Sequence, residues 1–187
     1  MLNIFILLTF YFLVIFSTLG IGYFVTSFSK NKIILNNLGY VGLIGILSLI
    51  IISYFSNLFV SHNYVFNALI LIIGLFFFIL QTVRNKNHSI NRQLKFVLLI
   101  FAILFVGIMM NKTHDDFQYY HFPYIYYLTQ SDLHIGIGNF NHGFRTSSSI
   151  FYLNSLFYLP FIKYYLFQAG AILIMGFSNL IILKKIE

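Results

Sequence analysis

The sequence has 187 residues, of which 59% are hydrophobic and 8% are charged, and its formal net charge is +7. Soluble domains carry roughly 25% charged residues, so the composition excludes an ordinary soluble domain and indicates an integral membrane protein. Cysteine is absent, which excludes a disulfide framework, a thiolate metal site and a cysteine nucleophile. The basic residues lie mainly at the ends of apolar runs, so we expect a lipid bilayer and no nucleic acid as a partner.

Apolar runs predict the membrane-spanning helices. The first run lacks a basic segment before it and is too long for a signal-peptide core, so we expect it to be a retained span. In the second run, Gly39, Gly42 and Gly45 recur every third residue and predict a close-packed helix face. Residues 147–161 form a shorter run, which we interpret as an interfacial or re-entrant helix. The expected spans are residues 2–28, 33–60, 64–83, 94–110 and 164–183, each to within a few residues.

Basic residues in the short loops predict the orientation, because Lys and Arg in such loops prefer the cytoplasmic side. The first and third loops are basic, whereas the second loop contains no Lys or Arg. We therefore expect one all-α membrane domain over residues 1–187, with about five spans. Its N-terminus and the loop of residues 111–163 would be extracytoplasmic, its C-terminus would be cytoplasmic, and its location would be a bacterial inner membrane. The basic residues of the two loops are Lys30, Lys32, Arg84, Lys86, Arg92 and Lys95.

Polar chemistry is concentrated in residues 111–149, which hold three of the four acidic residues and four of the six histidines. Asp115 and Asp116 come shortly after the fourth apolar run. Two neighbouring carboxylates can serve as a general base and as ligands for a divalent metal. The same segment also fits a capping box, with Thr113 as the N-cap and Asp116 at the third helical position. The two interpretations are compatible, since a capped turn holds a carboxylate rigidly.

Residues 117–130 predict an interfacial helix whose second half starts at Pro123. Its five tyrosines are interpreted first as membrane-interface anchors and second as groups that stack on a sugar or contact lipid. His121 would need a bend before Pro123 to join the aspartates as a metal ligand. His134 and His142 are interpreted first as polar anchors, and no histidine spacing typical of a zinc site supports one.

A glycine-rich turn follows the interfacial helix. Gly136-Ile137-Gly138 lacks the further glycines and lysine of a nucleotide-binding loop, so we predict a turn that folds residues 139–145 back under the aspartates. Arg145 is the only arginine of the loop. It fits the binding of a phosphate, and it equally fits pairing with Asp132 or with lipid headgroups. Ser147-Ser148-Ser149 predicts the N-cap region of the next helix.

Three segments in this order resemble a known family: DDFQYYHFP at residues 115–123, GIGNFNH at 136–142 and SSS at 147–149. An acidic pair after a helix that ends outside, an aromatic interfacial helix, a Gly/Asn turn and a short apolar helix resemble the first extracytoplasmic loop of the glycosyltransferase C superfamily. More narrowly, the segments are similar to the N-terminal part of uncharacterised polytopic bacterial proteins grouped with that superfamily. The resemblance covers residues 111–185.

The resemblance implies a lipid-linked sugar donor. It implies that Asp115 acts as the general base, or positions the acceptor or a divalent metal, with Asp116 as its partner. Substrate-binding roles are assigned to Tyr120, His121, Asn139, His142 and Arg145, and Arg145 would neutralise the donor phosphate. Two features depart from the family pattern. Gly-Phe precedes Arg145 where the family has Arg before Phe-Gly, and family members continue through many more spans, which implies a missing C-terminal part or a partner subunit.

The expected function is that of a membrane glycosyltransferase, or of its N-terminal fragment. It would transfer a sugar from a polyprenyl-phosphate-linked donor at the extracytoplasmic face. The alternative is a non-catalytic membrane subunit or a transporter fragment whose loop binds a partner. A coding frame that continues past Glu187 would favour the enzyme. Transporters usually carry ionisable residues inside their spans, and between Leu2 and Val83 only His62, at a break between two runs, lies away from the basic loops.

Overall fold

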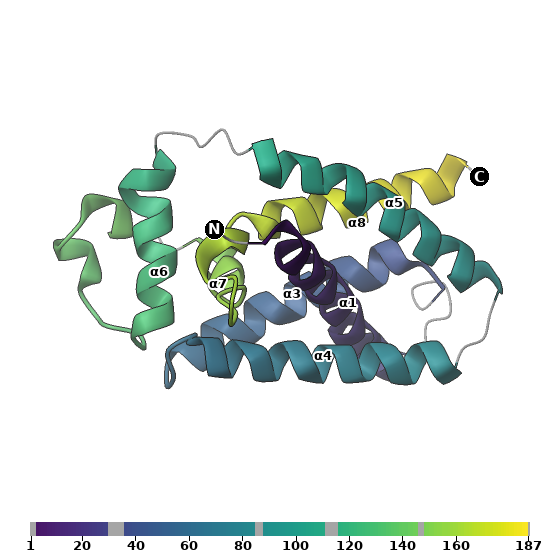
Figure 1. Cartoon of the computed structure of the whole chain (residues 1–187). Helices are drawn as coiled ribbons and strands as arrows, with labels where there is room; N and C mark the ends of the chain where they lie inside the picture. The colour runs from purple at the N-terminus through teal and green to yellow at the C-terminus, as the bar shows by residue number, and fades with distance from the viewer. Residues whose placement is uncertain (1–2, 30–35, 85–87, 111–115, 146–147, 187) are drawn as a thin grey trace.

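The computed structural model describes residues 3–29, 36–84, 88–110, 116–145 and 148–186 (Figure 1). Within these ranges the chain forms seven α-helices and no strand, which confirms the expected all-α fold. The described residues include one isolated bridge, between Leu159 and Lys163. The helices are α1 (Ile4–Ser29), α3 (Leu38–Asn57), α4 (Tyr64–Arg84), α5 (His88–Met110), α6 (Phe122–Gln130), α7 (Ser149–Ser155) and α8 (Ala169–Ile186).

Four of these helices are long enough and apolar enough to cross a membrane, which identifies an integral membrane protein. Their positions follow the apolar runs of the sequence, with two differences at the boundaries. α3 begins at Leu38, where the side chain of Asn37 accepts a hydrogen bond from the N–H of Gly39 (3.0 Å). α5 begins at His88, about six residues before the expected start. The four helical segments are Ile4–Phe28, Leu38–Asn57, Tyr64–Arg84 and Ile90–Met109.

The early start of α5 has a local cause. The guanidinium of Arg92 lies 5.9 Å from the ring centroid of Phe96, one turn further along the helix. The side chain of Gln93 accepts a hydrogen bond from the N–H of Leu38 (3.0 Å) and donates one to the carbonyl of Asn36 (2.9 Å). The polar residues before the apolar run are therefore held in a helical turn that is tied to the start of α3.

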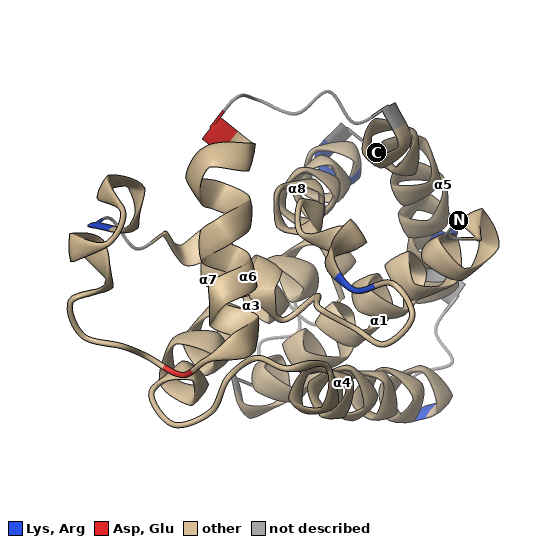
Figure 2. Cartoon of the chain, turned by 60° about the vertical axis from the view of Figure 1, so that its left-hand side comes forward, with Lys and Arg blue, Asp and Glu red and all other residues tan. Residues whose placement is uncertain are grey.

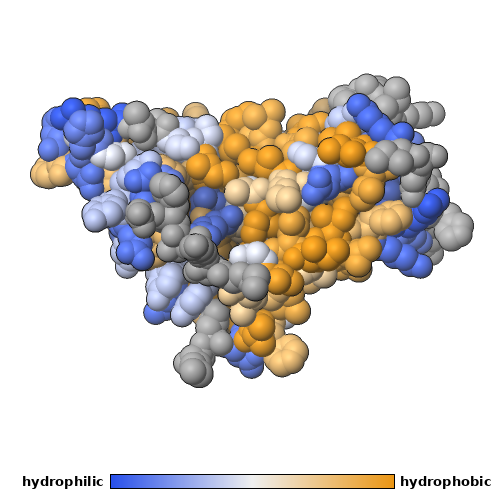
Figure 3. Space-filling model, turned by 90° about the horizontal axis from the view of Figure 1, so that it is seen from above, coloured by the Kyte–Doolittle hydropathy of each residue, from blue (hydrophilic) through white to orange (hydrophobic). Residues whose placement is uncertain are grey.

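The polar segments lie at two opposite ends of the molecule. α1 and α4 run in one direction, and α3 and α5 run in the other (Figure 1). We call the end that holds residues 58–63, 116–145 and 148–168 the loop end, and the opposite end the basic end. Lysines and arginines mark the last turns of α4 and α8 at the basic end (Figure 2). Both acidic residues that the structure describes, Asp116 and Asp132, belong to the loop end. Figure 3 shows a largely hydrophobic surface between two hydrophilic ends, as a bilayer requires.

Glycines allow the helices to approach closely. A side chain at Gly20 of α1 would overlap the backbone of Gly74 of α4. On α3, the predicted stripe is divided between two neighbours, because Gly39 and Gly42 face Phe177 of α8 while Gly45 faces the backbone of α1. The predicted close-packed face is thus confirmed, and it packs against two helices.

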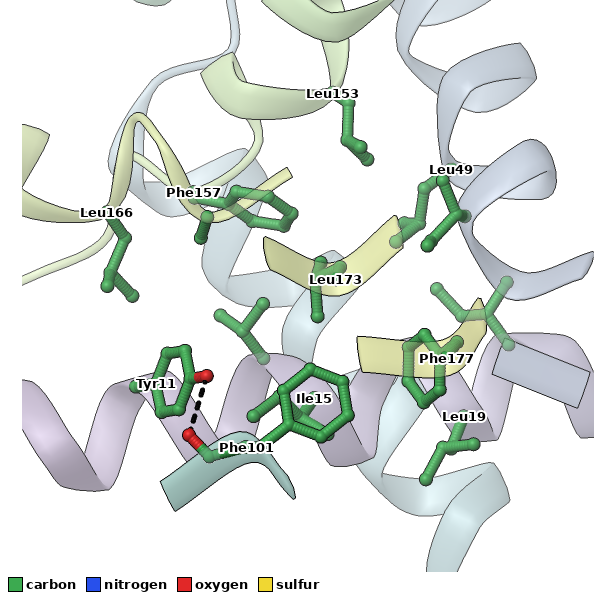
Figure 4. Close-up of a cluster of buried hydrophobic side chains, with 14 of the residues drawn as sticks. Tyr11, Ile15, Leu19, Leu49, Phe101, Leu153, Phe157, Leu166, Leu173 and Phe177 are labelled. Atoms are coloured by element: carbon green, nitrogen blue, oxygen red, sulfur yellow. Dashed lines mark hydrogen bonds between the residues drawn. The ribbon is translucent and has the colours of Figure 1, made fainter. Parts of the chain in front are cut away.

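The larger of two buried hydrophobic clusters joins the helices to the loop end (Figure 4). Its centre is Tyr11 of α1, whose hydroxyl donates a hydrogen bond to the carbonyl of Phe101 in α5 (2.9 Å). Leu173 and Phe177 of α8 belong to the same core, and α8 packs against both α3 and α5. Residues that precede α8 complete the core from the loop end, including Leu153, Phe157 and Leu166.

The segment between α7 and α8 differs from the prediction. α7 covers only Ser149–Ser155, and its last five residues are buried, which favours the re-entrant interpretation over an interfacial helix. Ser148 is its N-cap, as predicted, although the serine side chain makes no capping hydrogen bond. The chain then turns back through Phe161 and Lys163, both at positive φ (67° and 44°).

The last helix consequently starts later than the apolar run does. Residues 164–168 belong to a short 3-10 turn, Tyr164–Leu166, and to the link that follows it, and α8 begins at Ala169 rather than at Tyr164. Leu166 and Phe167 are buried in the bundle end. The sequence pattern cannot separate these apolar residues from a span, because a buried turn and a lipid-facing helix are equally hydrophobic.

Candidate functional site

The acidic pair expected at the end of α5 is described only in part. Asp115 and Thr113 lie outside the described residues, so the structure places neither the proposed base nor the N-cap of the expected capping box. Asp116 is exposed and directly precedes the π-helical turn η1 (Phe117–His121). Its backbone is helical (φ −61°, ψ −22°), and its carboxylate makes no capping hydrogen bond. Asp116 is therefore itself helical, and the capping box with Thr113 stays a prediction.

The chain continues from η1 into α6 without a break. The N–H of Phe122 donates to the carbonyl of Phe117, five residues earlier, and this wider turn accommodates Pro123 as the second residue of α6. The bend that His121 would need in order to join the aspartates is not seen between Phe117 and Pro123. The half-buried ring of His121 instead packs 4.8 Å from the ring of Phe151 in α7 and 4.3 Å from that of Tyr120.

The glycine-rich turn folds back as predicted. Gly136 adopts a left-handed conformation (φ 87°), which glycine tolerates without strain, and two short 3-10 turns follow: η2 (Ile137–Asn139) and η3 (His142–Arg145). η3 lies against η1, where Gly143 faces the side chain of Tyr120. The ring of Phe144 stacks on that of Tyr124, with the centroids 5.2 Å apart. Residues 139–145 therefore reach the first turn of the helix that follows Asp116.

Asn139 and Arg145 line a shallow depression of about 410 Å³ beside the glycine turn. Both side chains are exposed, as is His142 at the start of η3. The Nε of Arg145 donates a weak hydrogen bond to the carbonyl of Gly138 (3.4 Å). The alternative pairing of Arg145 with Asp132 is not observed, since the ion pair that the described residues show for Asp132 is with His134, at 4.0 Å.

A metal site gains no support from the described part of the chain, where no three His, Asp or Glu side chains are grouped to hold an ion. Among the predicted site residues, Tyr120 and His121 lie together next to the η3 turn. Asn139 and Arg145 lie together at the depression beside the glycine turn. The candidate metal ligand Asp115 lies outside the described ranges.

An apolar cavity of about 500 Å³ opens at the loop end and was not expected from the sequence. Phe117, the residue after Asp116, forms part of its wall, so the cavity begins where the acidic segment ends. Its described lining comes from four separate stretches of the chain, which explains why no local pattern predicts it. The described lining residues are Ile4, Leu7, Ile108, Met109, Phe117, Phe122, Tyr164, Tyr165, Phe167, Gln168 and Ala169.

Beneath the loop end, His62 is completely buried and makes hydrogen bonds through both ring nitrogens. Nδ1 lies 2.6 Å from the hydroxyl of Ser155 in α7, and Nε2 lies 3.0 Å from that of Ser56 in α3. Its backbone N–H donates to the carbonyl of Leu128 in α6 (2.9 Å). Burial lowers the pKa of His62 to about 4, and a hydrogen bond with the backbone of Ser53 acts in the opposite direction.

Asn67 completes this polar cluster. Its side-chain amide donates to the carbonyls of His62 (2.7 Å), Ser155 (2.9 Å) and Tyr158 (2.9 Å). Together, the hydrogen bonds of His62 and Asn67 connect α6 and α7 to α3 and α4, so these elements of the loop end are held rigidly against the bundle. The available sequence signals were a histidine in a break too short for a solvated loop and an asparagine, Asn67, near the start of the apolar run that follows.

No characterised protein and no solved structure gives a significant match to this chain. One family model does match, and it extends from residue 1 to residue 187 without a gap in its bounds. Its description assigns no activity. The chain thus belongs to the family described as Domain of unknown function (DUF8201).

Proposed function

We propose that this protein is a membrane glycosyltransferase that transfers a sugar from a polyprenyl-phosphate-linked donor. The observation that carries the proposal is the cavity of about 500 Å³ whose apolar wall starts at Phe117, directly after Asp116. A polyprenyl chain is wholly apolar, whereas its phosphate and sugar must stay hydrated or hydrogen-bonded. Such a donor therefore has to lie across a boundary between an apolar cavity and a polar surface.

The proposed roles follow that boundary. The first isoprene units occupy the cavity, where Gln168 and the tyrosine hydroxyls of the lining bind the phosphate. Arg145, which lines the separate depression beside the glycine turn, is proposed to neutralise the phosphate charge. The acceptor oxygen attacks the anomeric carbon, the bond from that carbon to the phosphate oxygen breaks, and Asp115 takes the hydroxyl proton. Asp116 orients Asp115 or shares a divalent metal with it. The remaining contacts to sugar and acceptor come from Tyr120, His121, Asn139 and His142.

In this proposal α8 is a fifth crossing, and the loop end is extracytoplasmic. α8 has 18 residues, which corresponds to about 27 Å of helix and is close to the thickness of a bilayer core. The basic side chains in the last turns of α4 and α8 support the orientation, because such residues favour the cytoplasmic side. The membrane would be a bacterial inner membrane, where polyprenyl-phosphate donors are available.

The test uses membranes that contain the protein and a polyprenyl-phosphate donor with a radiolabelled sugar. We expect Asp115→Asn to lower transfer of the label by about 100-fold or more, since general-base catalysis contributes that much. Asp132→Asn is the matched control, because Asp132 is an exposed acid of the same loop, and it should retain transfer. Undiminished transfer by a normally inserted Asp115→Asn protein would reject the assignment.

A second candidate function, a subunit whose loop binds a partner, is favoured by two exposed apolar residues. Ile135 is 100% exposed and Phe140 is 91% exposed, and both flank the turn at Gly136. In this second candidate function, the two side chains would provide the apolar contacts to the partner. If this candidate is right, Ile135→Ser with Phe140→Ser abolishes co-purification of the partner, and Asp115→Asn has no effect on it.

A further inference from the structure

A second cavity, of about 460 Å³, lies at the basic end between the last turns of α1 and α4. Because it belongs to the opposite end of the bundle from Asp116, it is separate from the proposed transfer site. α1 contributes three residues to it and α4 contributes five. They are Tyr23, Phe24, Ser27, Phe77, Leu80, Gln81, Val83 and Arg84.

One part of this cavity is apolar and faces the membrane. The rings of Phe24 and Phe77 lie 4.4 Å apart between centroids and form a continuous surface between the two helices. Leu80 and Val83 are 49% and 66% exposed, so the rim opens sideways to lipid rather than into the protein core. An acyl chain can therefore enter this cavity from the bilayer.

The other part of the cavity offers hydrogen-bond donors without acceptors. Tyr23 is 3% exposed, and within the described part of the chain its hydroxyl has no hydrogen-bond partner. The half-buried side-chain amide of Gln81 also makes no hydrogen bond within the described part of the chain. The hydroxyl of Ser27 already donates a hydrogen bond to the carbonyl of Phe24 (2.6 Å). Tyr23 and Gln81 can therefore each donate a hydrogen bond to a ligand in this cavity.

Arg84 supplies the charge at this site. It is the last residue of α4, is exposed, and forms no ion pair with any residue that the structure describes. Both helices end here, and the partial negative charge of their C-termini opposes an anion, so any anionic ligand depends on the guanidinium. Arg92, Lys184 and Lys185 make the surroundings more positive, and the described residues of this end include no acid.

We propose that this cavity binds one anionic glycerophospholipid. The lipid phosphate accepts hydrogen bonds from Arg84, from the hydroxyl of Tyr23 and from the amide of Gln81. An acyl chain covers Phe24 and Phe77. An anionic headgroup is favoured over a zwitterionic one because the ammonium of the latter would lie among the arginines and lysines of the basic end. This proposal does not depend on the glycosyltransferase assignment.

The experiment measures lipid binding to the purified full chain in non-ionic detergent by native mass spectrometry. We expect phosphatidylglycerol to bind saturably, with one tightly bound lipid per chain. Arg84→Gln should weaken this binding about tenfold, since it removes hydrogen bonds from a charged donor, and Tyr23→Phe should weaken it about threefold. Arg92→Gln removes the same charge at the same end but outside the cavity, and it should change binding by less than about twofold.

Three results would overturn the proposal. Equal affinity for phosphatidylcholine, or equal loss in Arg84→Gln and Arg92→Gln, would mean general attraction of lipid to a basic surface. Equal binding of glycerophosphoglycerol, the headgroup without acyl chains, would mean a site for a soluble phosphate. Arg84 is exposed, so its replacement leaves the fold intact, and unchanged thermal unfolding of the lipid-free variant checks this.

Discussion

At the scale of single residues, the buried His62 supports the loop end and does not face the proposed substrate. Both of its ring nitrogens are hydrogen-bonded to serine hydroxyls, and Asn67 binds its carbonyl. In the sequence, His62 is recognisable only as part of a break between spans, because its partner Ser155 in α7 lies 93 residues away in the chain. Tertiary contacts of this range leave no local pattern.

The lowered pKa of His62 predicts a specific loss of stability in acid. The unfolded chain binds a proton at His62 below its ordinary pKa of 6.5, whereas the folded chain binds it only near pH 4. The contribution of His62 is therefore fully present above pH 6.5, and up to about 3 kcal/mol is lost as the pH falls from 6.5 to 4. Thermal unfolding in detergent at several pH values measures this loss.

The matched variant is His62→Gln, which keeps a polar side chain and cannot titrate. It should be less stable than the wild type at pH 7.5 and should lose less additional stability between pH 6.5 and pH 4. An identical pH profile for the two proteins would show that His62 is not the titrating group.

At the scale of elements, the sequence predicted the helices that depend on local signals. α1, α3, α4 and α5 follow uninterrupted apolar runs, and the fold-back after Gly136 follows from the conformational freedom of glycine. The predicted end of α7 and the predicted start of α8 were wrong, because burial against the core determines both boundaries. The two cavities were missed because their walls combine residues from distant segments.

The crossing of α1 and α4 gives a prediction about packing. Gly20→Ala should destabilise the protein by about 1–3 kcal/mol, because the new methyl group would overlap the backbone of Gly74, which cannot move without separating the helices. Gly107→Ala is the control, since nothing lies within 4 Å of a methyl group at that position. It should stabilise α5 by up to about 1 kcal/mol. Thermal unfolding of both variants tests the crossing, and equal effects would contradict it.

At the scale of the whole molecule, the charge asymmetry predicts the orientation in the membrane. The chain has no cysteine, so single cysteines report their own positions. Leu133→Cys at the loop end should react with a membrane-impermeant maleimide in intact cells, and Lys185→Cys at the basic end should react only after the cells are permeabilised. The reverse pattern would place the loop end in the cytoplasm and would remove the proposed access to an extracytoplasmic acceptor.

The central claim is that the cavity beside Asp116 holds the lipid of a polyprenyl-phosphate donor. Its most direct test is cross-linking with a photoactivatable polyprenyl phosphate in membranes, followed by mass-spectrometric mapping of the labelled peptides. We expect label on peptides that contain Met109 and Phe117. Met109→Trp should reduce the label by filling the cavity, whereas Val106→Trp, one turn earlier on the same exposed face of α5, should not. Label spread along all lipid-facing helices, or equal labelling of both variants, would contradict the account.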